Sequence, residues 1–419
     1  MRSYPVSLIK QISKEAIRMP AESLLKVYLS TLPQVRFSPE KVRKILIFAY
    51  HGLGNFIMFT PALRLLRERY PHARIDLQAG NNTGADEVLA GSGIFDNIYN
   101  IPYSAGLRAW LNRAREIRDT GYDMTVNELH SHAWPLALTI AMSRAPFRLG
   151  HVTSPGWPHR LSRYSFVFNI PVFMKEDEHE VDRYLDLVEA AGARRVKLAD
   201  ARPFVHINDG HREFARRFFD ERKLTGPVIG IQPGASSTMS WKRWPADRYR
   251  KVIDRLIAER PDQQFILFGT ASEADATKDL ARDLDGNITV AAGKTDVKEV
   301  AALIERCDVL MCNDSGLMHV AVAVGTPVIA IYGPTDIRRT APLGPGHTVI
   351  RHELPCSPCF RLEGDDQILQ CPHHDCLMTI TPEEVYEIAS SVVASRPAAL
   401  DSSGLSRHFL DGRVKSPVE

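Results

Sequence analysis

The sequence lacks any apolar run close to the ~20 residues that a helix needs to cross a bilayer. It also lacks an excess of one charge. Its 52 lysines and arginines face 50 aspartates and glutamates, and the net charge of +2 gives no support to nucleic-acid binding as the main role. The first residues do not resemble a signal peptide, because Lys10, Lys14, Glu15 and Arg18 interrupt any apolar core. We therefore expect a cytoplasmic protein without a nucleic-acid partner.

Cysteine is scarce as well, with six residues in a chain of 419. Two of them, Cys307 and Cys312, lie in or beside an expected strand, where we expect them to pack in the core. The other four form a CxxC pair followed by a CxxxxC pair: Cys356, Cys359, Cys371 and Cys376. This pattern leaves open a structural zinc site, disulfides or reduced thiols, and a cytoplasmic location weakens the disulfide option.

What the sequence does contain is typical of a globular protein with two domains. Hydrophobic residues make up 44% and charged residues 24% of the chain. Expected strands and helices alternate in both halves, which predicts an α/β fold. We expect a helical extension over residues 1–40, a first domain over 41–222, a second domain over 223–395 and a disordered tail over 396–419. The charged helix within 203–225 would then end the first domain.

The most informative stretch runs from Cys307 to Asp336 and predicts a strand, a tight turn, a helix and a second strand. The turn is Asp314-Ser315-Gly316, with Ser315 as the N-cap. Leu317, Val320, Ala321 and Val324 follow at helical spacing, and Gly325-Thr326-Pro327 ends the helix. The first amides of such a helix lack intrahelical acceptors and carry partial positive charge, so a diphosphate fits there. The alternative is an ordinary crossover with a capped helix.

Two other stretches have the same order. Residues 44–50 form an expected buried strand, the turn His51-Gly52-Leu53-Gly54-Asn55 follows, and a helix is expected over 56–70, where Pro61 is tolerable only near the first turns. Residues 227–232 form a strand, followed by the loop 233–237, the segment Lys242-Arg243-Trp244-Pro245 and a helix over 246–259.

Together these segments resemble glycosyltransferase family 9, the heptosyltransferases that build the inner core of bacterial lipopolysaccharide. The matching text is DSGLMH with GTPVIAIYGPTD, GLGNFIMFTPALRLLRERYP, and PGAS with KRWP. The resemblance runs from about Lys44 to about Ser390. It implies the GT-B arrangement, in which two Rossmann-like domains face each other across a cleft, with the acceptor held by the first and the donor by the second. In that arrangement the last helix, from Pro382, usually crosses back to the first domain.

On the donor side the resemblance implies that Lys242 neutralises the diphosphate of the sugar donor. Asp314 would lie beside the donor as a catalytic candidate, and Glu273 near the ribose. His319 would either contact the ligand or act as a structural cap. The full set of expected donor residues is Lys242, Ser236, Glu273, Ser315, Gly316 and His319.

On the acceptor side the chain departs from the family pattern. The family carries an aspartate as general base where this chain has Asn55, and an amide cannot accept a proton at neutral pH. His51 on the same loop is the first substitute, since a histidine suits a base, and the alternative is a loop histidine that binds nothing. Further acceptor candidates are Gly54, Glu128, His130 and His132. The two histidines have no third ligand placed by sequence, so we expect no metal there.

The implied activity is inverting, metal-independent and cofactor-free transfer of heptose from ADP-heptose to a lipopolysaccharide core acceptor. Asn55 leaves open two alternatives: a transferase for another surface glycan with a different nucleotide sugar, and a catalytically inactive nucleotide-sugar-binding homologue. The partners would be a nucleotide diphospho-sugar and a glycolipid.

Two basic segments of the chain could contact a membrane or its glycolipids. Residues 3–31 predict two short basic amphipathic helices split at Pro20, which would either lie on the inner face of the cytoplasmic membrane or pack on the domain behind them. Arg148 and the basic loop 151–165 would either meet glycolipid phosphates or be solvated.

Overall fold

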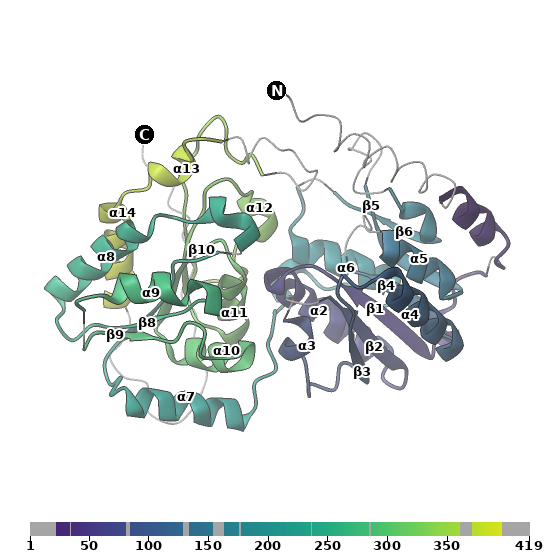
Figure 1. The fold of residues 1–419 in the computed structure, drawn as a ribbon, viewed down its shortest axis with the longest axis horizontal. Coiled ribbons are helices and arrows are strands. Elements are labelled where there is room, and N and C mark those ends of the chain that lie inside the picture. Colours follow the sequence, from purple (N-terminus) through teal and green to yellow (C-terminus); the bar gives the residue numbers. More distant parts are fainter. Residues whose placement is uncertain are drawn as a thin grey trace.

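In a computed structural model of the chain, the described residues are 22–33, 35–80, 84–128, 134–153, 163–175, 177–235, 237–284, 286–360 and 371–395. They form two α/β halves, each built on a six-stranded parallel sheet with helices on both faces (Figure 1). This confirms the predicted fold class of two Rossmann-like units. The expectations for residues 1–21, for 154–162 of the basic loop and for the tail 396–419 lie outside the described residues.

The first sheet has the strand order β3-β2-β1-β4-β5-β6. Its strands are β1 (Lys44–Ala49), β2 (Arg74–Ala79), β3 (Asn97–Asn100), β4 (Met124–Asn127), β5 (Phe147–Val152) and β6 (Ile170–Phe173). Its helices are α2 (Leu53–Arg69), α3 (Ala85–Val88), α4 (Leu107–Thr120), α5 (Trp134–Met142) and α6 (Glu180–Ala190), with short 3-10 turns η1 (Pro39–Lys41), η2 (Ser165–Val167) and η3 (Leu198–Asp200).

The second sheet has the order β12-β11-β10-β7-β8-β9. Its strands are β7 (Val228–Gln232), β8 (Gln264–Leu267), β9 (Ile288–Val290), β10 (Val309–Asn313), β11 (Val328–Ile331) and β12 (Thr348–Ile350). Its helices are α7 (Asp209–Glu221), α8 (Ala246–Glu259), α9 (Ala274–Ala281), α10 (Val297–Arg306), α11 (Gly316–Val324), α12 (Ile337–Thr340), α13 (Asp375–Met378) and α14 (Pro382–Ala394), with η4 (Ser237–Lys242) and η5 (Ala271–Glu273).

Both sheets change direction at a central pair of strands. In the first sheet the order reverses between β1 and β4, and in the second between β7 and β10. Ligands of open α/β sheets bind beyond the carboxyl ends of the strands at such a switch point. The two places where a site is expected are therefore the residues just after β1 and β4, and those just after β7 and β10.

The central strands are buried because helices cover both faces. Every residue from Ile45 to Ala49 in β1 and from Val309 to Asn313 in β10 is buried, which suits the near-continuous apolar runs of parallel strands. One apolar cluster continues from β1 of the first half to Met318 and Val320 of α11 in the second. The halves are thus joined by a shared core.

Helix α2 corrects one detail of the sequence interpretation. It begins at Leu53 rather than at residue 56, so Pro61 lies in the helix interior and cannot donate to the carbonyl of Ile57. The hydroxyl of Thr60 donates to that carbonyl at 2.7 Å instead. The preceding threonine therefore satisfies the acceptor that proline leaves open, and Asn55 falls within the first turn.

Two helices pack differently from the expectation. Helix α14 does not cross back to the first half, because Val385, Ala389 and Val393 are buried in the core of the second half (Figure 1). Helix α7 also lies beside the second sheet, where Arg212 pairs with Glu305 of α10 at 3.0 Å. The division at residue 222 stays a prediction, and this packing favours a boundary before α7.

The N-terminal helix is described over residues 22–30. Leu25 is buried against the first half, whereas Leu24 and Val27 are 71% and 63% exposed. The expected packing on the domain behind it therefore holds for one face, and the other face stays exposed. Within the described ranges, no helix combines the length and apolarity needed to cross a membrane.

Candidate active site

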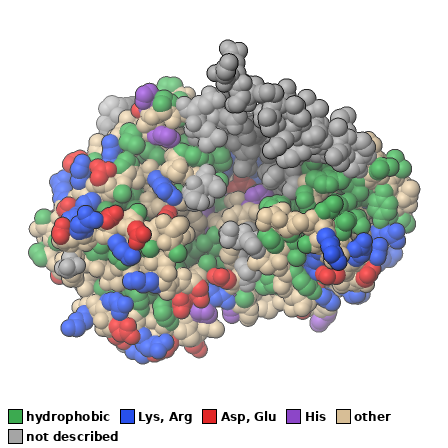
Figure 2. Space-filling model, in the orientation of Figure 1, with side chains coloured by type: hydrophobic (Ala, Val, Ile, Leu, Met, Phe, Trp, Pro, Cys, Tyr) green, Lys and Arg blue, Asp and Glu red, His purple; other side chains and the backbone are tan. Residues whose placement is uncertain are grey.

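The carboxyl edges of the two sheets face each other through the first turns of α2 and α11 (Figure 1). A Cβ built on Gly54 would lie 2.8 Å from the ring of His319 and 3.4 Å from Cα of Gly316. A Cβ on Gly316 would lie 3.4 Å from the amide nitrogen of Gly54. Glycine at both positions therefore lets two helix N-termini, each carrying partial positive charge, approach closely. Figure 2 shows the surface hollowed between the two halves.

Ser315 occupies the N-cap position of α11 as predicted, but its side chain does not cap the helix. Its hydroxyl donates instead to Oε1 of Gln232, at the end of β7, at 2.5 Å. This bond crosses the switch point of the second sheet. It leaves the first amides of α11 without a capping side chain from Ser315, and such amides bind anions.

Lys242 and Asp314 form an ion pair beside that helix end. The Lys242 Nζ lies 2.6 Å from Oδ2 of Asp314, and the side chains are only 13% and 6% exposed. An ammonium group has three donors, and Asp314 takes one of them. The carboxylate thus holds Lys242 in place, and a catalytic role for Asp314 stays a prediction.

Asn313 is a site residue that the sequence interpretation missed. Its amide donates to the carbonyls of Pro233 and Gly234 at 2.8 and 3.0 Å. Its oxygen accepts from the Trp244 amide and the Tyr249 hydroxyl, both at 3.0 Å. All four hydrogen-bonding positions of this buried side chain are used. A polar residue at the end of an otherwise apolar strand was the signal that could have found it.

Glu273 lies on the same edge, against the loop after β7. One carboxylate oxygen closes a capping box on Thr270 at 2.9 Å. The other is buried next to Gly234, where an added Cβ would come within 1.9 Å of it, and it has no hydrogen-bond partner among the described residues. Glu273 therefore reaches the loop after β7, and its contact with a ribose stays a prediction.

In the first half, His51 and Glu128 meet across the switch point. His51 follows β1 and Glu128 follows β4. Oε1 of Glu128 accepts from the His51 amide at 3.1 Å and lies 2.9 Å from Nδ1 of its ring. Glu128 is 1% exposed, and its Oε2 has no partner in the described chain. A carboxylate on Nδ1 fixes the proton there, which makes Nε2 the basic nitrogen.

Asn55 lies in the first turn of α2 and is half-buried. Its side chain makes no hydrogen bond to any residue that the structure describes. It is thus positioned beside Gly54 at the meeting point of the halves, where an amide can bind a ligand but not take its proton. Three other predicted residues, Ser236, His130 and His132, lie outside the described part of the chain.

His319 lies in the second turn of α11 and is neither a cap nor solvent-exposed. Burial lowers its pKa to about 4, so the ring is neutral at pH 7 and packs against Gly54. His179, the N-cap of α6, donates through Nε2 to the carbonyl of Ala341 at 3.0 Å. These contacts join the halves with neutral imidazole rings.

A buried ion pair adds a charged link between the halves that the sequence interpretation also missed. Glu180 of α6 contacts Arg339 of α12 at 2.5 Å and Arg183 at 3.0 Å. Burial alone raises the pKa of Glu180, but the two guanidinium groups outweigh it and hold the pKa below its usual value. The carboxylate is therefore ionised, and it ties α6 to α12 near the cleft.

Whether the four C-terminal cysteines bind zinc stays a prediction. All six cysteines are free thiols, and within the described residues no three or more His, Cys, Asp or Glu side chains gather in a group that could hold a metal ion. Cys356 is exposed, whereas Cys376 is buried with its sulfur against Gly333. The burial that holds Cys376 also raises its pKa to about 11.

Two Rossmann-like halves, each built on a six-stranded parallel sheet with its own switch point, form the GT-B arrangement. The model of glycosyltransferase family 9 (heptosyltransferase) matches residues 110–367. The chain belongs to this family and is a glycosyltransferase, as the sequence motifs predicted.

Relatives match along nearly their whole length. Lipooligosaccharide heptosyltransferase 2 of Haemophilus influenzae is 28% identical over 361 residues, which is 84% of this chain and 99% of that protein. Lipopolysaccharide heptosyltransferase 2 of Escherichia coli K12 is 27% identical over 364 residues, 85% of this chain and 100% of that protein.

Solved structures agree on the fold. The ADP-heptose lipopolysaccharide heptosyltransferase II of Escherichia coli superposes with a TM-score of 0.65 at 25% identity, over 84% of this chain and 98% of that one. A family 9 glycosyltransferase from Veillonella parvula gives a TM-score of 0.68 at 22% identity, over 87% and 100%, and supports the fold alone.

Proposed function

We propose that this protein transfers heptose from ADP-heptose to a sugar of the lipopolysaccharide core. The names of its full-length relatives support the sugar and the acceptor. The observation that carries the proposal is the meeting of two helix N-termini at Gly54 and Gly316, with the Lys242–Asp314 pair beside them. That junction places two helix N-termini and a lysine where the diphosphate of the donor would lie.

The second half holds the donor in this proposal. The diphosphate lies on the amides that open α11, and Lys242 donates to it with the protons that Asp314 leaves available. Charge develops on the diphosphate as the sugar departs, and donors already in place stabilise it without reorganisation. These groups supply the positive charge that a metal would otherwise provide, so turnover needs no metal ion.

The first half activates the acceptor. The acceptor oxygen attacks the anomeric carbon while the bond from that carbon to the diphosphate oxygen breaks, so a single displacement inverts the configuration. The hydroxyl proton goes to Nε2 of His51, and Glu128 stabilises the imidazolium that forms. Asn55 binds the acceptor through its amide. His51 thus takes the role that an aspartate plays at position 55 elsewhere in the family.

Such an enzyme would work in the cytoplasm, at the inner face of the membrane that holds its glycolipid acceptor. The substitution by Asn55 is the specific observation that favours a second candidate, a transferase for another surface glycan. An inactive homologue that only binds the nucleotide sugar is the third.

The test is to incubate the purified protein with ADP-, GDP- and UDP-linked sugars and core acceptors, and to follow donor depletion and product mass. ADP-heptose should be consumed only when a heptose-deficient core acceptor is present, at the same rate with and without EDTA. Consumption of another donor supports the second candidate. ADP binding without any turnover identifies an inactive homologue, and a rate lost in EDTA rejects the metal-independent mechanism.

A further inference from the structure

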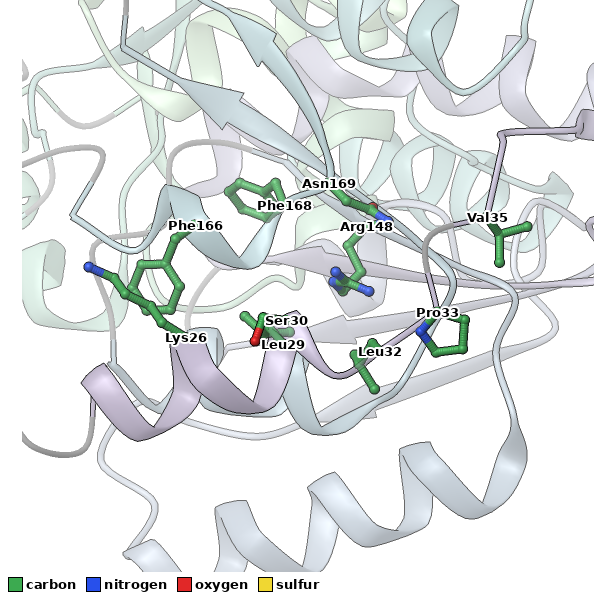
Figure 3. A pocket seen from close by; sticks show the side chains of 10 residues that line it. All are labelled: Lys26, Leu29, Ser30, Leu32, Pro33, Val35, Arg148, Phe166, Phe168 and Asn169. Carbon is green, nitrogen blue, oxygen red and sulfur yellow. The ribbon is translucent and has the colours of Figure 1, made fainter.

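A second cavity lies away from the cleft, between the N-terminal helix and the amino ends of β5 and β6. Its volume is about 460 Å³, within the ~300–1,000 Å³ typical of small-ligand pockets. The lining residues are Lys26, Leu29, Ser30, Leu32, Pro33, Val35, Arg148, Phe166, Phe168 and Asn169 (Figure 3). Arg148 is the second residue of β5, so it lies about 13 Å from the carboxyl edge that faces the cleft.

The described walls of this cavity are mainly aliphatic and aromatic, and no acidic side chain is among the described residues that line it. Among these residues the charged groups are Lys26 and Arg148. Lys26 lies over the ring of Phe166 at 5.0 Å, and Figure 3 shows Arg148 extending from its strand toward Ser30 and Leu29. An apolar pocket with only cationic groups fits an amphiphile that carries an anion.

Arg148 is the strongest sign of an anionic ligand. It is 6% exposed, yet it has no carboxylate partner in the described chain. Its Nε and Nη1 donate to the carbonyls of Val167 and Ala145 at 2.8 and 2.7 Å, whereas its Nη2 makes no hydrogen bond to a described residue. Burial lowers the pKa of this guanidinium. A buried cation without a counter-charge is costly, and a bound anion would relieve that cost.

The surface around the pocket is apolar as well. Leu24, Val27 and Val35 are 71%, 63% and 42% exposed, and all three lie on the segment that closes the pocket. Figure 2 shows hydrophobic side chains gathered at this end of the molecule, with lysines and arginines beside them. Exposed apolar groups next to cations are typical of segments that lie at a membrane interface.

We propose that this pocket binds an anionic phospholipid of the membrane. Its phosphate would sit against Arg148, one acyl chain would lie along Phe166, Phe168 and Leu29, and Lys26 beside Phe166 would add positive charge at the far end of the pocket. Leu24 and Val27 would enter the interfacial layer of the bilayer. The pocket lies on the opposite edge of the first sheet from the cleft, so it is separate from the proposed acceptor site and does not depend on which sugar is transferred.

The test measures co-sedimentation of the full-length protein with vesicles of phosphatidylcholine alone or with 30 mol% phosphatidylglycerol, about a third of the lipid. The wild type should bind the anionic vesicles at least ten-fold more strongly. Arg148→Gln should remove most of that difference, and Lys26→Gln should reduce it about five-fold, as one cation near an anionic surface does. Arg118→Gln, a control on exposed α4, should bind like the wild type.

Calorimetry with dihexanoyl phosphatidylglycerol and with inorganic phosphate separates the lipid from the free anion. The short-chain lipid should bind at least ten-fold more tightly than phosphate, and Arg148→Gln should abolish its binding. If Arg148→Gln fails to fold, vesicle binding by a variant of the exposed Lys26 decides instead. Lys26→Glu should weaken binding to anionic vesicles more than the control Arg118→Glu does. Three results overturn the proposal. They are equal binding of the wild type to neutral and anionic vesicles, equal affinity for inorganic phosphate and the short-chain lipid, and a loss of vesicle binding in the Arg118 variant as large as that in the Arg148 or Lys26 variant. A dimer in solution that the substitution Leu24→Ser dissociates would also overturn the proposal, because a second copy of the chain would then cover this face.

Discussion

Each half of the molecule bridges its switch point with one pair of side chains, and the two pairs differ in chemistry. In the first half, His51 and Glu128 join the ends of β1 and β4 at 2.9 Å. In the second half, Ser315 and Gln232 join the ends of β10 and β7 at 2.5 Å. The first pair joins an imidazole to a carboxylate, whereas the second joins a hydroxyl to an uncharged amide.

The difference extends to the surroundings of each pair. The second half is fixed by the four bonds of Asn313 and by the Lys242–Asp314 pair, which suits binding of a permanent anion. The first half leaves Asn55 and one oxygen of Glu128 without partners among the described residues. A site whose hydrogen-bonding groups lack protein partners is suited to a ligand that supplies those partners. In the proposed function, donor binding and proton transfer therefore fall to different halves, and mutations in each half test that division.

The largest expected effect follows from removing the base. His51→Gln should lower kcat by ~10²–10⁴-fold, because glutamine cannot take the proton of the acceptor hydroxyl. The affinity for ADP, measured by calorimetry, should not change, since His51 lies in the other half. Glu128→Gln should lower kcat by about ten-fold, or about 1.4 kcal/mol, because it weakens the stabilisation of the imidazolium.

A rescue experiment places a carboxylate at position 55 of the His51→Gln variant. If proton transfer is the role of His51, then Asn55→Asp in the His51→Gln background should recover at least ten-fold of the lost kcat. Asn55→Ala in that background serves as the control and should recover nothing. Wild-type turnover in His51→Gln would remove this histidine from catalysis and move proton transfer to another group.

Next in size is the loss of the donor's counter-charge. Lys242→Met should lower kcat/KM by ~10²–10³-fold, because a positioned cation at the leaving group is lost and Asp314 is left buried and unpaired. ADP affinity should fall with it, in contrast to His51→Gln. Lys251→Met, on the exposed face of α8, is the matched control. The double variant Lys242→Met/Asp314→Asn should bind ADP more tightly than Lys242→Met alone, and equal binding would contradict the ion-pair argument.

Much of this division could be predicted from the sequence. Apolar runs ending in short turns located β1, β10 and the start of α11, since strand burial and helix breaking are local properties, whereas the start of α2 was placed three residues too late. The turn at Ser315 and Lys242 also led to the expected anion site, which stays a prediction. The parts that failed depend on contacts between distant segments. The partner of Ser315 is Gln232, 83 residues away, and no local pattern predicts it.

The inter-half contacts were missed for the same reason. Glu180 and Arg339 are 159 positions apart, and each alone is an ordinary charged residue on a helix. Gly54 and Gly316 were predicted as turn residues, but their tight approach is visible only once both halves are in place.

A third experiment targets the rigidity of the donor half. Asn313→Ala leaves two buried carbonyls, an amide and a hydroxyl without their partners, which should cost about 4 kcal/mol of stability at about 1 kcal/mol each. Thermal unfolding should show a clearly lower Tm, and ADP should raise it less than in the wild type. Asn112→Ala, an exposed asparagine on α4, is the control and should leave the Tm unchanged. An equal Tm in both variants would mean that the network does not stiffen the donor half.

The smallest expected effect concerns pH and the junction itself. Burial lowers the pKa of His319 to about 4, so between pH 6.5 and 4 the unfolded chain binds a proton that the folded chain excludes. Stability is therefore fully present above pH 6.5 and falls as the pH drops, by about 2 kcal/mol at pH 5. His319→Asn should flatten that fall in chemical unfolding curves. His347, whose pKa burial also lowers to about 4, is the matched control. His347→Asn should flatten the pH dependence of stability to the same extent but leave the acid limb of turnover unchanged. His319→Asn should change both the stability curve and the acid limb of turnover, because of these two histidines only His319 contacts Gly54 at the junction of the halves.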